Sequence, residues 1–455
     1  MRTPCSLILA VLAIALNAHA APGKNVIIMV ADGMGYNQIE AASFHRFGAA
    51  RGQSYWKMQH LPITTYSTNN MEGYPVEKLW ADFKYFLRVP TDSSAAASAI
   101  SSGVKCPNAR VGVSKEGEHL PHMLYDAERM GKATGLVSTV RLTHATPASF
   151  SVHDVGRTNE EPIARKMLLE SAVDLIIAPG HPWRDEDGRE IAGADNPDAG
   201  SYTYVGGLEL WNQLRAGTAG GDADGDGDAD PWSLLDTTEA IVALADAPQA
   251  ARVLGLVPVG KTLQVNRGGD VLADAFAVPF TPGLPTLAQL SRAALAQLAQ
   301  DPDGFYVMIE GGAVDWAGHD NRPGRLIEEQ IDFDLAVEAV EAWVEQHSNW
   351  DETMLFFTAD HECGYLTGPG SNPDWKPIVN NGQGKMPGME FHSPQHTNQL
   401  VPVFAKGAGV EKLLEYVYGT DPRHGDYADN TDISKVIRHA WGVSLPPSDG
   451  KIARN

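Results

Sequence analysis

The chain has 455 residues, of which 43% are hydrophobic and 8% aromatic, so it can bury a large core and is neither disordered nor fibrous. Lys and Arg number 35 against 57 Asp and Glu, which gives a formal net charge of −22. A surface this acidic repels nucleic acids and anionic membranes, which argues against both as partners.

The first twenty residues have the pattern of a secretory signal peptide. Arg2 supplies a positive charge, residues 6–16 form an apolar core, and Ala18-His19-Ala20 fits a small-x-small cleavage signal. The apolar run is shorter than a comfortable membrane span. We therefore predict cleavage near Ala20, a mature chain from Ala21 and a periplasmic or secreted protein, with an uncleaved N-terminal anchor as the alternative.

Short apolar runs that end at glycine or at polar, ligand-type residues recur along the chain. Continuous runs of this kind are typical of strands buried on both faces of a parallel sheet. They cover residues 25–30, 134–140, 173–178, 305–309, 354–358 and 400–405. Helix-like stretches lie between them, at residues 95–102, 122–130, 160–170, 287–299 and 324–345.

Alternating strands and helices predict an α/β fold with a large, mostly parallel central sheet, helices on both faces and surface insertions. We expect one domain over residues 21–455, with insertions near residues 181–285 and 364–395. In such sheets ligands bind outside the carboxyl ends of the strands, where this chain repeatedly carries Asp, Glu or His.

The apolar run at residues 305–309 leads into the strongest metal-binding pattern. Asp315 and His319 are four residues apart, so on a helical turn both point to one side and can bind one metal ion. Glu310, at the preceding strand end, can reach an adjacent hard cation. A single Asp-x-x-x-His pattern is common, and the alternative is a capped or solvated helix.

Three further positions beside apolar runs carry ligand-type residues, namely Asp32, the pair Asp360-His361, and His396. Asp32 is followed by Gly33 and Gly35, which allow close approach of another backbone. Each residue alone could be a hydrogen-bonded core group. Together they predict a shared centre of multivalent cations, because unpaired buried charge is costly.

The segment Thr91-Asp92-Ser93-Ser94 opens a helix rich in Ala and Ser that stops near Gly103. N-capping alone accounts for one of these residues. The functional alternative places a serine hydroxyl at the positive end of a helix, where an incoming anion is also stabilised. A cation at that oxygen would lower its pKa and make it a nucleophile.

Five ordered motifs together resemble the alkaline phosphatases, and the match extends from residue 25 to about residue 405. The motifs are Val-Ala-Asp32-Gly-Met-Gly, Thr-Asp92-Ser93, Glu310-Gly-Gly-x-x-Asp315-x-x-x-His319, Thr-Ala-Asp360-His361 and His396-Thr. The resemblance implies an exported bacterial hydrolase that takes small-molecule phosphate monoesters. The family often forms homodimers, but no sequence feature decides the oligomeric state or the natural substrate.

The resemblance also implies the roles of individual residues. Ser93 would be the nucleophile and form a phosphoseryl intermediate, with Ser94 as its competitor. Arg157 would clamp two phosphate oxygens, which suits guanidinium geometry. Trp316 would line the substrate pocket, with ordinary packing as the alternative.

Two zinc ions and one magnesium ion are the implied cofactors. The ligands of the first zinc, which would activate the hydrolytic water and stabilise the leaving oxygen, would be Asp315, His319 and His396. The ligands of the second zinc, which would bind the serine alkoxide, would be Asp32, Asp360 and His361. The ligands of magnesium would be Asp32, Thr146 and Glu310. Two cations about 4 Å apart can stabilise the attacking and departing oxygens at once.

One departure from the family concerns the magnesium site. Some members carry aspartate where this chain has His144, two residues before Thr146. We therefore expect His144 to lie behind the ligands and Mg²⁺ to bind weakly or indirectly.

Two other functions stay open. One is a phosphodiesterase or sulfatase of the same superfamily, although the proline of the sulfatase-like stretch at residues 106–110 is one place early. The other is a non-catalytic, calcium-organised secreted protein. Its basis is a candidate Ca²⁺ loop with alternating carboxylates, with a solvated acidic loop as the alternative. The carboxylates are Asp222, Asp224, Asp226, Asp228 and Asp230.

The two cysteines that follow the signal peptide leave their redox state undecided. Cys106 and Cys363 could form one disulfide or remain as two buried free thiols.

Overall fold

The computed structural model describes residues 23–223 and 227–444, and eleven of its strands form one central sheet. These strands are β1 (Asn25–Ala31), β2 (Gln59–Thr64), β3 (Ala133–Ser138), β4 (Leu175–Ala178), β7 (Ser233–Leu235), β8 (Val253–Leu256), β9 (Phe305–Gly311), β10 (Thr353–Thr358), β15 (Val401–Lys406), β16 (Gly419–Asp421) and β17 (Gly425–Asp429). Their order across the sheet is β16-β17-β2-β15-β10-β1-β9-β3-β4-β8-β7. Only β15 and β16 pair antiparallel with their neighbours in this sheet, so the predicted mostly parallel arrangement is confirmed.

The middle of the sheet is apolar on both faces, as the continuous apolar runs require. Every residue of β1, β9 and β10 is buried. Val30 of β1 lies opposite Glu310 of β9 on one side and Thr358 of β10 on the other. Because these strands are parallel and end at the same level, Asp32, Glu310 and Asp360 all reach the same edge of the sheet.

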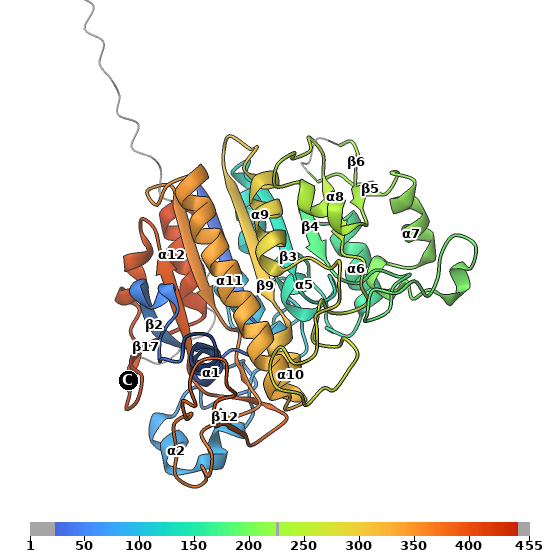
Figure 1. Ribbon diagram of the computed structural model, residues 1–455. Coiled ribbons are helices and arrows are strands. Elements are labelled where there is room, and N and C mark those ends of the chain that lie inside the picture. Colours follow the sequence, from blue (N-terminus) through green and yellow to red (C-terminus); the bar gives the residue numbers. More distant parts are fainter. Residues whose placement is uncertain (1–22, 224–226, 445–455) are drawn as a thin grey trace, which may run out of the picture.

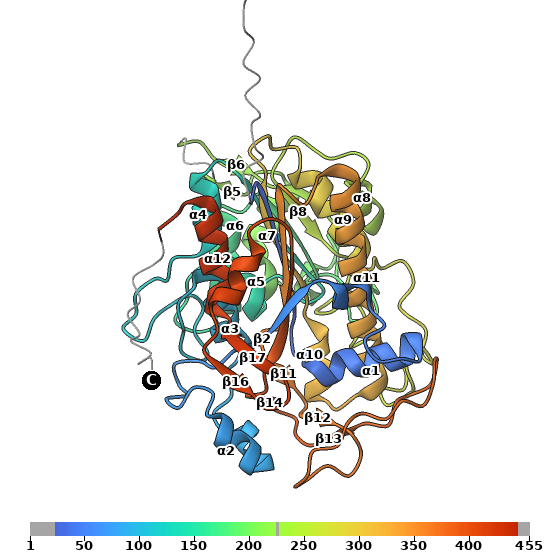
Figure 2. The ribbon, with the colours of Figure 1, turned by 90° about the vertical axis from the view of Figure 1, so that its left-hand side faces the viewer.

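Helices cover both faces of the sheet. They are α1 (Tyr36–Phe47), α2 (Val76–Ala81), α3 (Ser93–Ser102), α4 (Met123–Arg129), α5 (Ala145–Ser151), α6 (Glu160–Leu169), α7 (Leu208–Arg215), α8 (Thr238–Ala243), α9 (Leu287–Leu298), α10 (Ala313–His319), α11 (Pro323–His347) and α12 (Thr431–Trp441). Short 3₁₀ helices add η1 (Ser54–Lys57), η2 (Phe83–Leu87), η3 (Pro197–Ala199), η4 (Thr203–Val205) and η5 (Val410–Glu415). Helices α8, α9 and α11 lie on one face, and α3, α4, α5 and α12 lie on the other (Figures 1 and 2).

All six predicted strands and all five predicted helices are present, with ends that differ by at most two residues. The segment expected as an insertion at residues 181–285 does more than cover the surface. Its strand β8 pairs with β4, and β7 pairs with β8, so it completes one edge of the sheet. Its tip carries the short pair β5 (Gly220–Gly221) and β6 (Asp230–Pro231).

Residues 364–395 form an excursion that is pinned at its base and packed inside. Two short ladders pair β11 (Glu362–Cys363) with β14 (His396–Thr397), and β12 (Leu366–Thr367) with β13 (Glu390–Phe391). Tyr365 is fully buried, and its ring stacks on Phe83 of η2 at a centroid distance of 4.5 Å. The excursion therefore contributes a small core of its own beside the carboxyl edge of the sheet.

Across residues 23–223 and 227–444, every helix is too short or too polar to cross a membrane. The predicted signal peptide, residues 1–20, lies outside the described residues.

Candidate active site

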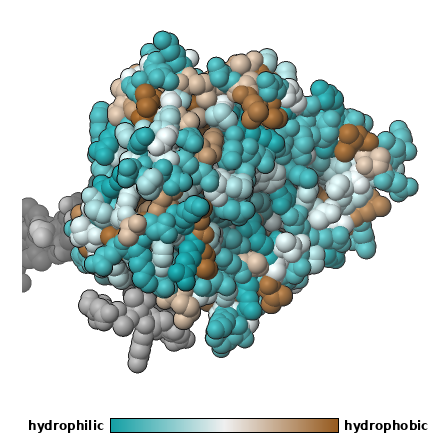
Figure 3. All heavy atoms as spheres, turned by 90° about the horizontal axis from the view of Figure 1, so that it is seen from below, coloured by the Kyte–Doolittle hydropathy of each residue, from teal (hydrophilic) through white to brown (hydrophobic). Residues whose placement is uncertain are grey.

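Acidic and histidine side chains converge at the carboxyl edge of the sheet, on the side of the molecule that Figure 3 shows to be mostly hydrophilic. In the described part of the chain they form three overlapping groups, and within each group one candidate ligand atom per residue lies within 4.8 Å of the others. The groups are Asp315, His319, Cys363 and His396; Asp32, Asp315 and His361; and Asp32, His144 and Glu310.

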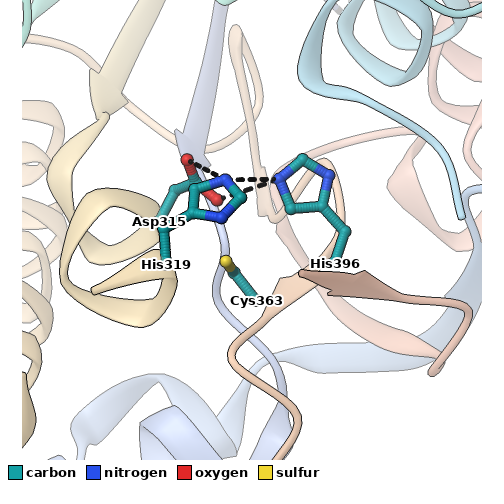
Figure 4. Close-up of side chains that lie close together, drawn as sticks. All are labelled: Asp315, His319, Cys363 and His396. Carbon is teal, nitrogen blue, oxygen red and sulfur yellow. Dashed lines mark hydrogen bonds and ion pairs between the residues drawn. The ribbon is translucent and has the colours of Figure 1, made fainter. Parts of the chain in front are cut away.

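The first group joins α10 to β14 (Figure 4). Asp315 and His319 project from one side of α10, and His319 Nε2 lies 3.4 Å from Asp315 Oδ2. His396 reaches in from β14, and its Nε2 lies 3.2 Å from Asp315 Oδ1 and 2.9 Å from His319 Nε2. The i,i+4 spacing therefore brings the Asp315 and His319 side chains together as predicted, and His396, which is distant in sequence, contacts both of them.

Backbone carbonyls fix how the two imidazoles of this group are oriented. His319 Nδ1 donates to the Pro394 carbonyl at 2.6 Å, and His396 Nδ1 donates to the Thr91 carbonyl at 2.8 Å. A carbonyl only accepts, so each Nδ1 carries a proton, and each ring, when neutral, presents the lone pair of Nε2. Two such lone pairs facing each other at 2.9 Å favour a cation between them.

The Ser93 hydroxyl lies against the His361 ring of the second group. His361 Nε2 lies 3.2 Å from Ser93 Oγ, 3.2 Å from Asp360 Oδ2 and 3.6 Å from Asp32 Oδ1. Asp360 Oδ1 accepts from the amides of Gly33 and His361, which leaves Oδ2 directed at the group. Ser93, His361 and both aspartates are buried.

Asp92 organises the serine segment. Its carboxylate caps α3 by accepting from the Ala95 amide at 2.9 Å, and it also accepts from Ser94 Oγ at 2.9 Å. Ser94 is thereby turned away from the site, whereas Ser93 faces His361. Asp92 Oδ2 holds the Arg157 guanidinium at 3.0 Å, so this arginine lies beside the start of the helix.

The third group contains oxygen donors and one imidazole. His144 Nδ1 lies 3.7 Å from Glu310 Oε1 and 3.8 Å from Asp32 Oδ2, so His144 stands among the acidic groups rather than behind them. Thr146 follows on α5 and is fully buried. Ser138 Oγ donates to Glu310 Oε2, which orients this carboxylate.

Several buried polar atoms of these groups have no hydrogen-bond partner within the described residues. Among them are both carboxylate oxygens of Asp32, Oε1 of Glu310, Oδ2 of Asp360, Nδ1 of His144 and Oγ1 of Thr146. Burying so many unpaired polar atoms is costly. Divalent cations would satisfy them, with imidazole and carboxylate donors suited to zinc and the oxygen donors suited to magnesium. The residues present therefore fit these ions.

The carboxylates also perturb one another. Burial, and then the charges of Asp360 and Asp315, raise the pKa of Asp32 well above its ordinary value. Burial and the charge of Asp315 raise the pKa of Asp360 to about 7. Burial acts in the same direction on Asp315, but a hydrogen bond and charge from His396 outweigh it and lower the pKa of Asp315. Bound cations would relieve this repulsion.

An aromatic and cationic wall borders the third group. The Trp316 ring lies 5.9 Å from the His144 ring, and the Arg141 guanidinium lies 5.4 Å from the Trp316 ring centre. Arg141 also pairs with Glu160 at 2.6 Å. The sequence indicates Trp316 but gives no reason to select Arg141, whose position depends on how the loop after β3 folds.

Cys363 is the donor that the sequence interpretation missed. It lies in the first group, is fully buried, and its thiol pKa is raised by burial and by the charge of Asp315. Its place two residues after the Asp360-His361 pair was the available signal. Cys106 and Cys363 are both free and buried, so the disulfide left open above is absent from the described residues.

The acidic loop at residues 222–230 lies far along the chain from these groups. Asp222 accepts from the Gly227 amide at 3.1 Å, and Asp230 accepts from the Ala223 amide at 2.8 Å. Asp224 and Asp226 lie outside the described residues. Calcium binding by Asp222, Asp228 and Asp230 stays a prediction.

Comparisons with known proteins agree with the geometry. Residues 23–400 match the family model described as alkaline phosphatase. The chain is 28% identical over 404 residues to alkaline phosphatase 3 of Bacillus subtilis, covering 86% of this chain and 70% of the relative. It is 27% identical over 441 residues to the alkaline phosphatase of Escherichia coli, covering 93% and 87%. The fold is similar to that of a cold-active alkaline phosphatase from Shewanella sp., with a TM-score of 0.64, 23% identity, and 93% of this chain and 100% of that chain covered.

Proposed function

Since the chain belongs to the alkaline phosphatase family, we propose that it hydrolyses phosphate monoesters to an alcohol and inorganic phosphate through a covalent phosphoserine on Ser93. The observation that carries this proposal is the position of the Ser93 hydroxyl. It lies in the first turn of α3, buried, 3.2 Å from His361 and next to the group formed with Asp32 and Asp315.

The reaction has two displacements at phosphorus. In the first, Ser93 Oγ attacks, the bond from phosphorus to the substrate oxygen breaks, and the alcohol leaves with the proton that the serine gives up. In the second, water attacks the phosphoserine, the Oγ–P bond breaks, and inorganic phosphate is released as Ser93 regains a proton. The positive end of α3 and the Arg157 guanidinium stabilise the phosphoryl oxygens throughout.

We propose two zinc ions and one magnesium ion as cofactors. The nitrogen-rich donors Asp315, His319 and His396 suit one zinc, and Asp32, Asp360 and His361 suit the other. Asp32, Thr146 and Glu310 supply oxygen donors for magnesium. When bound, these ions stabilise charge on the attacking and leaving oxygens and lower the pKa of hydroxyl and water.

Ser93→Ala and Ser94→Ala test the nucleophile, since the two serines are adjacent and only one faces the metal groups. Each variant is mixed with a ³²P-labelled aryl phosphate and quenched in acid. We expect label on the wild type and Ser94→Ala chains, and neither label nor appreciable turnover with Ser93→Ala. A labelled, fully active Ser93→Ala enzyme would overturn the proposal.

The substrate class is tested separately with an aryl phosphate monoester, the matching diester and the matching sulfate. We expect the monoester to be hydrolysed fastest, and a strong chelator to abolish that rate until metal is returned. Faster turnover of the diester or the sulfate would favour the superfamily alternatives instead.

We further propose export of the protein to the periplasm or medium. The support is the basic, apolar and small-residue pattern of residues 1–20. N-terminal sequencing of the chain recovered from outside the cytoplasm is expected to begin at Ala21. A homodimer is expected from the family resemblance, and light scattering of the purified enzyme tests it.

A further inference from the structure

We infer that the thiol of Cys363 supplies a fourth ligand to the metal ion held by Asp315, His319 and His396. The inference rests on the metal centre of the proposed function and adds a sulfur donor to it. It is carried by the position of Cys363 in a short strand, by the close approach of α10, and by the burial of this thiol beside the Asp315 carboxylate.

Strand pairing places Cys363 beside His396. In the antiparallel ladder of β11 and β14 these two residues are direct partners. Direct partners point to the same face, with Cβ atoms about 4.5–5.5 Å apart. The Cys363 amide also donates to the Gly33 carbonyl at 3.1 Å, which fixes this strand against the end of β1. Figure 4 shows the sulfur directed into the space between α10 and the His396 ring.

Helix α10 approaches Cys363 more closely than most residue types would allow. A Cβ atom on Gly318 would lie 3.0 Å from the Cys363 Cβ and 3.0 Å from its carbonyl oxygen. Because Gly318 lies between Asp315 and His319 in the helix, this contact brings both of their side chains to the cysteine. One donor atom from each of the four residues, including the sulfur, lies within 4.8 Å of the others.

Burial and donor chemistry indicate that Cys363 is a metal ligand and not merely a packed core residue. Cys363 is fully buried and Asp315 is 4% exposed, so the thiol lies beside a buried carboxylate, whose Oδ1 is 3.2 Å from His396 Nε2. One oxygen, two imidazole nitrogens and one sulfur form a four-donor set that zinc binds well, and sulfur disfavours magnesium and manganese. The thiol gives its proton to solvent as the metal–sulfur bond forms. A substrate or water oxygen would then be a fifth ligand.

Cobalt substitution of the holoenzyme tests this inference directly. The wild-type protein is stripped with a chelator, reloaded with Co²⁺ and examined by absorption spectroscopy. We expect visible d–d bands, which report bound cobalt whatever its ligands, together with a strong sulfur-to-cobalt charge-transfer band in the near ultraviolet. This measurement needs no variant, so a folding defect cannot confuse it.

The charge-transfer band is assigned with two variants, Cys363→Ser and Cys363→Ala, and the matched control is Cys106→Ser. Cys106 is equally buried, but its sulfur faces the Val113 carbonyl at 3.2 Å and belongs to none of the metal groups found in the described residues. We expect Cys106→Ser to keep the charge-transfer band and both Cys363 variants to lose it. Zinc affinity, measured by competition with a chromophoric chelator, should fall at least about tenfold in the Cys363 variants.

The outcomes separate this inference from the proposed function. Wild-type d–d bands without a charge-transfer band would overturn the sulfur ligand and leave the metal centre in place. A charge-transfer band that survives in Cys363→Ser would have the same meaning. If cobalt and zinc do not bind at all and phosphatase activity is absent, both the ligand and the proposed function are overturned.

Discussion

The Asp92 side chain connects the start of helix α3 to Arg157. Its carboxylate caps α3, accepts from Ser94 and holds Arg157 at 3.0 Å. Burial opposes the charged guanidinium, but Asp92 outweighs it and raises the pKa of Arg157. One carboxylate thus keeps Ser94 out of the site and keeps a permanent positive charge at the start of the helix.

Arg157→Lys should separate charge from geometry. Lysine keeps the charge but cannot make two parallel hydrogen bonds to a phosphate. Losing one charged hydrogen bond of about 1.5–3 kcal/mol predicts a fall in kcat/KM of about tenfold to a hundredfold. Steady-state kinetics with an aryl phosphate measure kcat/KM. The control is Arg129→Lys, because Arg129 is an exposed arginine that pairs with Asp126. Equal kcat/KM for Arg157→Lys and the wild type would contradict the assigned role.

His144→Asp tests the magnesium site. His144 Nδ1 lies within 3.8 Å of Glu310 and Asp32 oxygens, so an aspartate here would add a negative oxygen donor to an oxygen-rich group. Mg²⁺ prefers such donors, and we expect its dissociation constant to fall by about tenfold, or about 1.4 kcal/mol. Calorimetry of the zinc-loaded enzyme measures it. His144→Asn, which adds a neutral oxygen, should change affinity less, and unchanged Mg²⁺ binding in both variants would count against the site.

Most residues of the candidate site could be predicted because they directly follow or adjoin apolar strands. Asp32, Glu310 and Asp360 stand at or just after strand ends, where sequence periodicity and ligand chemistry coincide. Cys363 and Arg141 could not be predicted in this way. Cys363 meets His396 only through a two-residue ladder, and Arg141 meets Trp316 only through loop packing.

At the scale of elements, Gly33 lets β1 and α10 meet. Its φ is +85°, and an added Cβ atom would lie 2.5 Å from the Asp315 Cα. Its amide donates to Asp360, and its carbonyl accepts from the Cys363 amide. The turn after β1 therefore sets the spacing between all three metal groups.

Gly33→Ala should disrupt that spacing, and Gly117→Ala is a matched control. Both glycines have positive φ, +85° and +93°, but a Cβ atom on Gly117 would meet nothing within 4 Å. Each substitution incurs about 1–2 kcal/mol of backbone strain, and only Gly33→Ala must also displace α10. We expect both variants to lower the melting temperature, and only Gly33→Ala to lose zinc affinity and activity. Equal activity in the two variants would show that this contact does not control the site.

The edges of the sheet are where prediction from sequence ends. β2 contains Pro62, which lies opposite Pro402 of β15, and proline argues against a strand. β7 has three residues, and the apolar run of β8 is interrupted by Gly255 and followed by Pro258, which weakens its strand pattern. β8 pairs with β4, and β7 pairs with β8, so their strand conformation depends on neighbours that are distant in sequence. The central strands carry enough apolar sequence to be recognised alone.

Considered as a whole, the molecule concentrates buried carboxylates at one edge of an already acidic protein. Asp32, Asp315, Asp360 and Glu310 are buried within this edge. Without cations, the native protein relieves the repulsion by holding protons, as the raised pKa values of Asp32 and Asp360 indicate. Metal binding must release those protons, so metal affinity and stability are both linked to pH.

The direction in which stability changes with pH depends on whether the native or the unfolded state binds more protons. The pKa of Asp32 is raised by burial and neighbouring carboxylates, that of Asp360 is raised to about 7, and Asp315 outweighs burial to raise that of His396. In the range above about pH 6.5 the metal-free native protein therefore holds more protons on these groups than the unfolded chain does. The native state then binds more protons, so its free energy of unfolding falls as the pH rises. Below pH 6.5 the lowered pKa values of His361 and His144 act in the opposite direction, because the unfolded chain then binds protons that these two native imidazoles do not.

We therefore expect the melting temperature of the chelator-stripped protein, relative to that of the metal-loaded protein, to fall as the pH rises from about 6.5 through the pKa of Asp360 at about 7, because the metal-loaded protein has released these protons. Calorimetry of both forms across this range measures the difference between their melting temperatures. Burial and the charge of Asp332 raise the pKa of Glu329 to about 8, and this residue lies outside the metal groups. Glu329→Gln should therefore change the melting temperatures of the stripped and the metal-loaded protein alike at each pH, and leave the difference between them unchanged. If the difference in melting temperature stays constant with pH, metal binding is not linked to the protons on these carboxylates.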